Sequence, residues 1–299
     1  MSGRQSAVAR RAEAVLGRAV VSTSPVAGGD VSIATKLRLS DGTLALMKTH
    51  ARPPAGFFPT EAAGLRWLAE ATASGGVAVP EVLAVTEDCL VLAWVEQGRA
   101  TSEGAEAFGR ALAATHALGA DRFGANGRGV DERGEPRDGF LGPLPLPQRS
   151  APTWAEFYAV RRLLPYLKLA RDRGRITPEQ AASVEALVPR LPDLVPAEPP
   201  ARIHGDLWNG NVLWGVDGGA WLVDPAAYAG HREVDLAMLS LFGLPQLARV
   251  LAAYAEAAPL ADGWEDRLAL HQIFPLLVHA VLFGGGYAAR AAELADRYR

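Results

Sequence analysis

Three side chains that carry oxygen lie near one another in the last third of the sequence. Asp206 and Asn211 belong to the run HGDLWNGN at 204–211, and Asp224 follows the apolar run WLV at 221–223. Carboxylate and amide oxygens are the ligands that Mg²⁺ prefers, and a carboxylate can accept a proton from a hydroxyl group. For Asp206 or Asn211 alone, the simpler interpretation is a residue that shapes a β-turn.

The order and spacing of these three residues predict phosphoryl transfer. In the catalytic loop of kinases, an Asp accepts the proton of the substrate hydroxyl and a later Asn reaches a metal ion, while an Asp beyond the next strand binds metal as well. Asp206, Asn211 and Asp224 follow the same order. We therefore expect Asp206 to be the catalytic base, and Asn211 and Asp224 to be ligands of Mg²⁺, which would neutralise charge on the phosphate oxygens.

Two residues upstream complete a site for ATP. Lys48 ends the strand-like run LALMK at 44–48, and Glu61 lies near the start of the predicted helix that follows. In kinases a strand Lys holds the α- and β-phosphates, and a helix Glu fixes that Lys by an ion pair. Taken alone, a Lys on a strand is most often a solvated side chain. Together with the downstream loop, Lys48 and Glu61 predict an ATP-binding pair.

Further nucleotide contacts are expected from the backbone. Gly28 and Gly29 lie between two strand-like runs, and glycine lets backbone N–H groups approach phosphate closely. The full G-x-G-x-x-G pattern is absent, and a Gly-Gly hairpin without any nucleotide is the commoner explanation. In the run LAWV at 92–95, we expect the backbone of Ala93 and Val95 to contact adenine, an interaction that leaves little trace in a sequence.

The elements that must carry these residues fall into two groups. The first comprises a helix at 3–19, three short strands, of which the last two are at 31–39 and 43–49 and are joined by the turn Asp41-Gly42, a helix at 60–74, and two strands near 81–85 and 90–95. This order predicts a small antiparallel sheet with one helix packed across it. Gln97-Gly98 is the expected hinge, so we expect an N-terminal ATP-binding lobe at 1–96 and a C-terminal catalytic and substrate-binding lobe at 97–299.

Beyond the hinge, hydrophobic periodicity predicts a mostly helical chain. The predicted helices lie at 103–118, 152–173, 178–191, 233–241, 246–257 and 264–289, with strand-like runs at 213–214 and 220–223. These elements predict an α+β, protein-kinase-like two-lobed fold whose C-terminal lobe is the larger. The segment 123–150, rich in Gly, Pro, Asp and Arg, is too long for a simple connection, and such a loop either carries function or is disordered.

Composition limits the remaining classes of function. The chain of 299 residues has a net charge of -3, which provides no strong field for nucleic acid or an anionic membrane. Cys89 is the one cysteine, so an internal disulfide and a cysteine-based zinc site are excluded, and a reducing, cytoplasmic compartment is expected. The longest apolar stretches, such as 273–283, are interrupted by Pro275 and His279, and no membrane span is predicted.

Two sequence blocks are similar to those of one family of small-molecule kinases. At 204–211 and 224–238 the chain resembles the fructosamine kinase family, also called ketosamine-3-kinases. The family blocks are HGDLWSGN and approximately DPAxYxGHREADLAM, and here they stand as HGDLWNGN and DPAAYAGHREVDLAM. Shorter blocks, TWAEFY at 153–158 and FGGGY at 283–287, extend the resemblance along nearly the whole chain.

The resemblance implies ATP-dependent phosphorylation of the sugar 3-hydroxyl of ketosamines, the Amadori products formed on amines and on protein lysines. The phosphorylated adduct then falls apart spontaneously, so the implied role is deglycation, a form of protein repair. The implied partner is a small-molecule ketosamine or a glycated protein lysine. Bacterial members of the family tend to prefer ribulosamines and erythrulosamines over fructosamines.

The resemblance also implies roles for individual residues. It assigns the base, the Mg²⁺ ligands and the ATP-binding pair to the residues singled out above, which are Asp206, Asn211, Asp224, Lys48 and Glu61. Trp208 and His279 would line the sugar pocket, because an indole face can stack on the apolar side of a sugar and an imidazole can bond its hydroxyls. Trp208 could instead belong to the core, and His279 could be a satisfied helix histidine.

Several positions around this set carry looser expectations. Asp235 is expected to bond the backbone of the catalytic loop, whereas His231, Arg232 and Glu233 could contact substrate or support residues that do. The part of the chain at 127–139 looks expanded relative to the family. If that loop helps to choose the amine, the acceptor could differ from the family norm.

Two other functions compete with a ketosamine kinase. A kinase of the aminoglycoside or choline type would keep the ATP site unchanged and alter only the acceptor pocket. A nucleotide-binding pseudokinase would act as a scaffold. The intact polar set of five residues argues against the pseudokinase, which commonly loses one of them.

Overall fold

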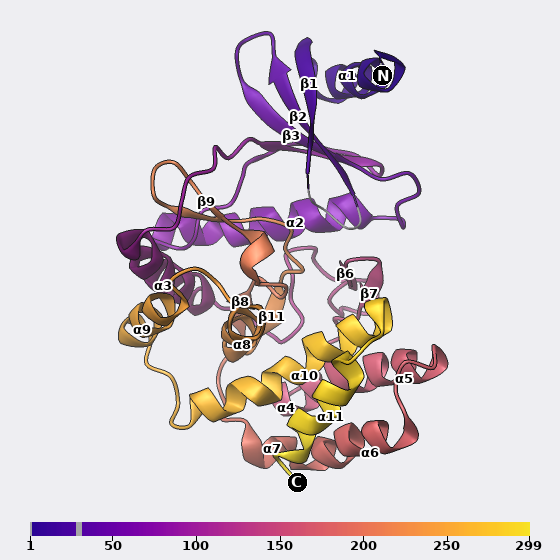
Figure 1. The fold of residues 1–299 in the computed structure, drawn as a ribbon, viewed down its shortest axis with the longest axis vertical. Coiled ribbons are helices and arrows are strands. Elements are labelled where there is room, and N and C mark those ends of the chain that lie inside the picture. The colour runs from indigo at the N-terminus through magenta and orange to yellow at the C-terminus, as the bar shows by residue number, and fades with distance from the viewer. Residues whose placement is uncertain (1, 28–31) are drawn as a thin grey trace.

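The computed structural model describes residues 2–27 and 32–299, which fold into two lobes (Figure 1). The smaller lobe is built around a five-stranded sheet, and the larger lobe is mostly helical. The predicted α+β architecture, with a small antiparallel sheet in one lobe and helices in the other, is confirmed.

The small lobe follows the predicted order of elements. It consists of α1 (Ser2–Leu16), β1 (Val20–Val26), β2 (Ile33–Leu39), β3 (Leu44–Thr49), α2 (Phe57–Ala69), a 3₁₀ turn (Glu70–Ser74), β4 (Val82–Val85) and β5 (Cys89–Ala93). The strands pair antiparallel in the order β1-β2-β3-β5-β4. The predicted turn joins β2 to β3, and the Asp41 carboxylate accepts the Thr43 N–H at 2.9 Å.

The two faces of this sheet pack on different helices. On one face, Met47 and its neighbours pack against α1, and on the other, Leu46 packs with the cluster around Phe58 and Leu65 of α2. Side chains alternate along a strand, so Lys48 shares the α2 side of the sheet with Leu46. This alternation turns the Lys48 ammonium toward the helix that carries Glu61.

The large lobe combines many helices with short strand pairs. Its elements are α3 (Ser102–Ala117), β6 (Gly139–Leu141), β7 (Leu144–Leu146), α4 (Trp154–Phe157), a π-helical turn (Tyr158–Leu163), α5 (Leu164–Asp172), α6 (Pro178–Leu187), a 3₁₀ turn (Val188–Arg190), α7 (Leu191–Leu194), β8 (Ala201–Ile203), a 3₁₀ turn (Asn209–Asn211), β9 (Val212–Trp214), β10 (Ala220–Leu222), β11 (Tyr228–Gly230), α8 (Glu233–Phe242), α9 (Leu247–Ala257), α10 (Trp264–Phe283) and α11 (Tyr287–Asp296). Its main core lies between α4, α5, α6, α10 and α11.

The C-terminal helix differs from its prediction. One helix is predicted at 264–289, which is wrong, because α10 ends at Phe283 and α11 begins at Tyr287. Gly284 and Gly285 between them have φ angles of 72° and 67°. Glycine adopts this left-handed conformation readily and ends helices with it. Apolar periodicity on both sides of the glycines conceals the break.

Three other elements depart from the predicted pattern. The helix predicted at 152–173 contains a π-helical turn just before Pro165, because proline lacks an N–H and cannot continue the regular ladder. The strands β8 and β11, which pair antiparallel, are not predicted at all. Each has three residues and is buried throughout, so neither shows the alternation that marks a strand.

The long segment at 123–150 is folded and contacts both lobes. It contains the β6–β7 hairpin, and Gly124 donates its N–H to the Ala229 carbonyl at 2.9 Å. Phe140 of the hairpin packs edge-on against Phe57 of α2, with ring centroids 5.5 Å apart. Of the two expectations for this segment, disorder is therefore wrong. A part in choosing the amine stays a prediction.

The helix α2 is also held from β8. Arg202 of β8 donates to the Trp67 carbonyl and, at 2.7 Å, to the Glu70 carboxylate. Its guanidinium lies over the Trp67 ring, 4.3 Å from the centroid. Gly127, from the long segment, lies so close to the same ring that a Cβ there would be 2.6 Å from an atom of Trp67.

The connection between the lobes pairs with the turn between β9 and β10. Gly98 donates its N–H to the Trp214 carbonyl at 2.6 Å, and Val216 donates to the Glu96 carbonyl at 3.1 Å. The division into domains at 1–96 and 97–299 stays a prediction. One described helix, α10, has the length and apolar composition to cross a membrane, but 56% of its most apolar part is buried inside the lobe. A core helix passes the same test, so α10 is weak evidence for a span.

Candidate active site between the lobes

Lys48 links the two lobes through two carboxylates. Its Nζ lies 2.6 Å from Glu61 Oε1 of α2 and 2.9 Å from Asp224 Oδ1, just beyond β10. Burial alone would lower the pKa of the Lys48 ammonium, but the charges of Glu61 and Asp224 outweigh it and raise that pKa above its ordinary value. The lysine is therefore a fixed positive charge at the junction of the lobes.

Asp224 has an unusual backbone conformation. Its φ angle is 54°, in the left-handed region, which non-glycine residues rarely adopt and which Asp tolerates better than most. Its side chain is 44% exposed, in contrast to the 9% of Lys48. The strained turn thus leaves the carboxylate bonded to Lys48 on one side and open to solvent on the other.

Asp206 and Asn211 contact each other across the catalytic loop. Asn211 Nδ2 donates to the Asp206 carbonyl at 2.8 Å and to Asp206 Oδ2 at 3.2 Å. Since the amide nitrogen faces Asp206, the amide oxygen of Asn211 is left for another partner. Burial raises the pKa of Asp206 to about 7, although the hydrogen bond from Asn211 works against it. A carboxyl group with such a pKa can accept and release a proton near neutral pH.

Asp235 holds the backbone at the start of this loop. Its carboxylate accepts the N–H groups of His204 at 2.7 Å and Gly205 at 3.0 Å, which confirms the expectation for this residue. His116 Nε2 lies 3.2 Å from the same carboxylate. Gly205 has a φ of 81°, and a Cβ there would be 2.3 Å from the Ala226 carbonyl oxygen, so this position requires glycine.

His204 joins the loop to the strand end before Asp224, a role that sequence reasoning missed. Its Nε2 donates to the Val223 carbonyl at 2.9 Å, and its Nδ1 accepts the Asp206 N–H at 3.3 Å. Burial lowers the pKa of His204, so the imidazole is neutral. The only hint of this role in the sequence was that His204 lies two residues before the proposed base, Asp206. Its bond to Val223 was not visible, because the partner lies on another element.

Trp208 and His279, the residues expected to contact sugar, lie on either side of Phe242. Trp208 is 39% exposed, and its ring centroid is 6.3 Å from that of Phe242. The His279 ring is 4.8 Å from Phe242, and its Nδ1 donates to the Pro275 carbonyl at 2.7 Å. Trp208 is therefore no core residue. His279 is a helix histidine whose Nδ1 is satisfied, and no hydrogen bond to its Nε2 is found among residues 2–27 and 32–299.

The backbone positions expected to bind nucleotide fall into three cases. Ala93 ends β5, and its N–H is already donated to the Glu81 carbonyl at 2.8 Å. Within 2–27 and 32–299, the Val95 N–H has no backbone partner outside the regular elements. Gly28 and Gly29 lie outside the described residues.

These contacts place a Lys–Glu pair from the sheet lobe opposite an Asp, an Asn and a second Asp from the helical lobe. That arrangement, in a two-lobed fold, defines an ATP-dependent phosphotransferase of the protein-kinase-like class. The chain belongs to the fructosamine kinase family, whose profile matches residues 4–298. The family resemblance seen in the sequence is thereby confirmed.

The chain is also similar to individual known proteins along most of its length. The chain is 40% identical over 264 residues to a Thermus thermophilus protein named as a ketoamine kinase, with 88% of each chain covered. It is similar to a crystal structure described as a fructosamine-3-kinase from Thermobifida fusca, with 45% identity, a TM-score of 0.87 and 96% of each chain covered. A macrolide 2′-phosphotransferase from Brachybacterium faecium, at 17% identity and a TM-score of 0.63 over 98% of each chain, shares the fold. The predicted protein-kinase-like fold is confirmed.

Proposed function

We propose that the protein transfers the γ-phosphate of ATP to the 3-hydroxyl of a ketosamine and so starts the removal of sugar adducts from amines. The observation that carries this proposal is the contact of Lys48 with Glu61 and Asp224 across the lobes, at 2.6 and 2.9 Å. It brings the phosphate-binding residues beside the loop of Asp206. Membership of the fructosamine kinase family supports a ketosamine as the acceptor.

The nucleotide would lie between the sheet and the catalytic loop. Lys48 would hold the α- and β-phosphates, and Glu61 keeps the lysine in place. The backbone of Ala93 and Val95 would contact adenine. The same proposal assigns phosphate contacts to the N–H groups of Gly28 and Gly29.

The donor set fits Mg²⁺, a hard cation that takes oxygen ligands. Asp224 is partly exposed and bonded to Lys48 on one side, and Asn211 has its amide oxygen available, so these two residues would hold the ion. When bound, Mg²⁺ neutralises negative charge on the phosphate oxygens.

The protein's own acid–base chemistry rests on Asp206. Its carboxylate would orient the acceptor hydroxyl and take its proton while the hydroxyl oxygen bonds to the γ-phosphorus and the bond from phosphorus to the ADP oxygen breaks. Asn211 Nδ2, at 3.2 Å from Asp206 Oδ2, holds the carboxylate in place for this. The sugar would stack on Trp208, and the Nε2 of His279 would bond a hydroxyl.

The acceptor proposal extends to its chemical class. An Arabidopsis protein that is 28% identical over 281 residues is named a protein-ribulosamine 3-kinase, so ribulosamines are the first class to test. Once C1 loses a proton to give the 1,2-enaminol, the phosphate on C3 can leave by elimination, and hydrolysis of the resulting imine by water would release the amine. The acceptor would be a free ketosamine or a glycated protein lysine in the cytoplasm, with neither nucleic acid nor membrane involved.

The experiment measures phosphate transfer from ATP in the presence of Mg²⁺ to ribulosyl-lysine, fructosyl-lysine or kanamycin. We expect labelling of the two ketosamines, with ribulosyl-lysine the better acceptor, and loss of the product when Asp206 is replaced by Asn. Labelling of kanamycin alone would overturn the proposal in favour of an aminoglycoside kinase.

A further inference from the structure

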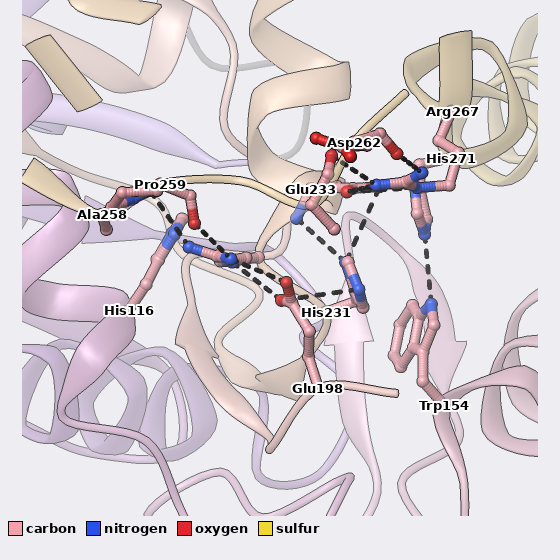
Figure 2. Close-up of polar contacts among 12 residues, drawn as sticks. His116, Trp154, Glu198, His231, Glu233, Ala258, Pro259, Asp262, Arg267 and His271 are labelled. Carbon is pink, nitrogen blue, oxygen red and sulfur yellow. Dashed lines mark hydrogen bonds and ion pairs between the residues drawn. The ribbon is translucent and has the colours of Figure 1, made fainter. Parts of the chain in front are cut away.

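A buried polar cluster joins the start of α8 to α10 and is not part of the site described above (Figure 2). It consists of His231, Glu233, Arg267 and His271, here called the Glu233 cluster. Glu233 is fully buried, and its Oε1 lies 2.7 Å from Nη2 of Arg267, while Arg267 Nε lies 3.2 and 3.1 Å from the two carboxylate oxygens. His231 and His271 stack on each other, with ring centroids 5.1 Å apart.

The spacing of this cluster would suit a metal ion, but its hydrogen bonds do not. His231, Glu233 and His271 offer ligand atoms within 4.8 Å of one another. Yet His271 Nε2 accepts a hydrogen bond from Trp154 Nε1 at 3.1 Å, and His231 Nδ1 accepts one from the Glu233 N–H at 3.3 Å. Both imidazole lone pairs are therefore occupied, and each ring carries its proton on the other nitrogen.

The charges of the cluster also balance without an ion. The other nitrogens lie near carboxylates, with His271 Nδ1 3.4 Å from Glu233 and His231 Nε2 3.6 Å from Glu198, although neither makes a hydrogen bond within the described residues. Each carboxylate has its own arginine, since Arg232 lies 2.7 Å from Glu198 as Arg267 does from Glu233. Two neutral imidazoles and two ion pairs leave no net charge for a cation to neutralise. The cluster must serve another purpose.

Its position on α8 indicates that purpose. Glu233 and Asp235 both lie in the first turn of α8, two residues apart, so they point to nearly opposite sides of the helix. Glu233 fixes that turn to Arg267 and His271 of α10. Asp235 fixes it to the N–H groups of His204 and Gly205, which precede the base. One helical turn is thus fastened to α10 on one side and to the catalytic loop on the other.

We propose that the Glu233–Arg267 ion pair is a positioning element for phosphoryl transfer. It sets the place of Asp235, and through Asp235 it sets the place of Asp206. Arg232, the residue before Glu233, provides no side-chain cap for α8 and is itself paired with Glu198. Two ion pairs therefore hold this end of the helix, and the pair of Glu233 is the one that joins the first turn to α10. The sequence left the role of Glu233 open, and the structure assigns it to support of the base rather than to substrate contact.

The proposal predicts a specific kinetic effect, and it rests on the function proposed above. A base displaced by about an ångström loses on the order of tenfold or more in rate, because the reacting atoms must be aligned. The ATP contacts of Lys48 and Glu61 come from the other lobe and do not depend on α8. Loss of the ion pair should therefore lower kcat and leave the KM for ATP nearly unchanged.

The test compares Glu233→Gln, Arg267→Gln and the double variant with a surface control. The control is Glu106→Gln, which removes an exposed ion pair with Arg249 that also measures 2.7 Å. Well below the unfolding midpoint, we expect kcat to fall about tenfold in each single variant, with the KM for ATP within about twofold of wild type. The double variant should fall no further than the worse single variant, because both substitutions remove one interaction.

Hydrogen exchange provides a readout that does not require a known acceptor. In Glu233→Gln the amides of His204 and Gly205 should exchange faster than in wild type, since Asp235 holds them, and in Glu106→Gln they should not change. Unaltered kcat and unaltered exchange at these amides, with only a lower unfolding temperature, would overturn the proposal. If wild type labels no ketosamine, the proposed function fails while the exchange result still decides this inference.

A second pair of variants covers the case in which neutral substitutions prevent folding. Arg267→Lys keeps the charge but loses the forked geometry, and Glu233→Asp keeps the charge on a shorter stem. Both should fold, lower kcat by a smaller factor than the neutral variants, and speed exchange at Gly205. Wild-type kcat and exchange in both would count against the positioning role.

Discussion

Lys48 and Asp224 are separated by 176 positions in the sequence, yet their side chains meet at 2.9 Å across the junction of the two lobes. The contact joins a strand of the sheet lobe to the turn that follows β10 in the helical lobe. It places a permanent positive charge where the phosphates of ATP would lie, beside the carboxylate proposed to hold Mg²⁺.

Replacing Lys48 by Met should remove the charge that holds the phosphates. We expect kcat/KM for ATP to fall on the order of 10²-fold, because a preorganised charge at the reacting phosphate is lost. Steady-state kinetics with varied ATP would measure this. Lys168→Met is the matched control, since Lys168 is an exposed lysine of α5, and wild-type kinetics are expected there.

Replacing Asp206 by Asn should abolish proton acceptance and preserve nucleotide binding. Turnover should fall by about 10²–10⁴-fold, the usual contribution of a general base. Calorimetry with ATP and Mg²⁺ should give an affinity close to that of wild type. Asp217→Asn, in the exposed turn between β9 and β10, serves as the control. Near-normal turnover in Asp206→Asn would remove this residue from its proposed role.

Trp208→Ala should weaken acceptor binding and leave ATP binding intact. Its ring is exposed beside the catalytic loop, and we expect the KM for the ketosamine to rise about tenfold, equal to roughly 1.4 kcal/mol. Trp264→Ala at the opposite end of α10 from His279 is the control. An unchanged KM for the acceptor would indicate that the sugar does not stack on this indole.

Gly210→Ala offers an independent way to move the same indole. A Cβ at Gly210 would lie 2.5 Å from the Trp208 ring, closer than atoms can approach, so the ring must shift. We expect a rise in the KM for the acceptor like that of Trp208→Ala, and the double variant should be no worse than Trp208→Ala alone. Additive effects would show that Gly210 acts through something other than the ring.

The free energy of unfolding should decrease when the pH falls below about 6.5. Burial lowers the pKa of His231 to about 3, and it lowers the pKa of His271 well below the ordinary value. An unfolded histidine has a pKa of about 6.5, so below that pH the unfolded chain binds more protons than the folded one. Each group then contributes a slope of up to about 1.4 kcal/mol per pH unit.

Urea unfolding at several values between pH 7.5 and 5.5 would measure that slope, with the pH values chosen to bracket the ordinary histidine pKa of about 6.5. His231→Gln should give a shallower dependence than wild type, because one buried neutral imidazole is gone. Equal slopes for wild type and His231→Gln would contradict the assignment of acid sensitivity to this imidazole.

The sequence predicted those parts of the site whose residues are ordered along the chain. Lys48, Glu61, Asp206 and Asn211 could be placed by motif and order alone, and the structure brings them together with Asp224. Contacts between residues that only the packing of the fold brings together could not be predicted from the sequence. The partners of Glu233 lie on α10, more than thirty positions away, so its role could not be decided without coordinates.

Local physics explains what was missed in the fold. The strands β8 and β11 are short and buried on both faces, so no alternation distinguished them from loop. The break at Gly284 was hidden because apolar residues continue on both sides. In contrast, the turn at Asp41-Gly42 was predictable, since its side-chain bond is made between neighbours in the chain.

The contacts of Arg202 with Trp67 and Glu70, and of Phe140 with Phe57, tie α2 to the helical lobe. An outward movement of α2 would separate Glu61 from Lys48. It would also expose these rings and leave the buried Arg202 guanidinium without its partners. An inactive state that depends on this movement of α2 would therefore be high in free energy. We therefore expect the activity of this protein not to be regulated by a movement of α2.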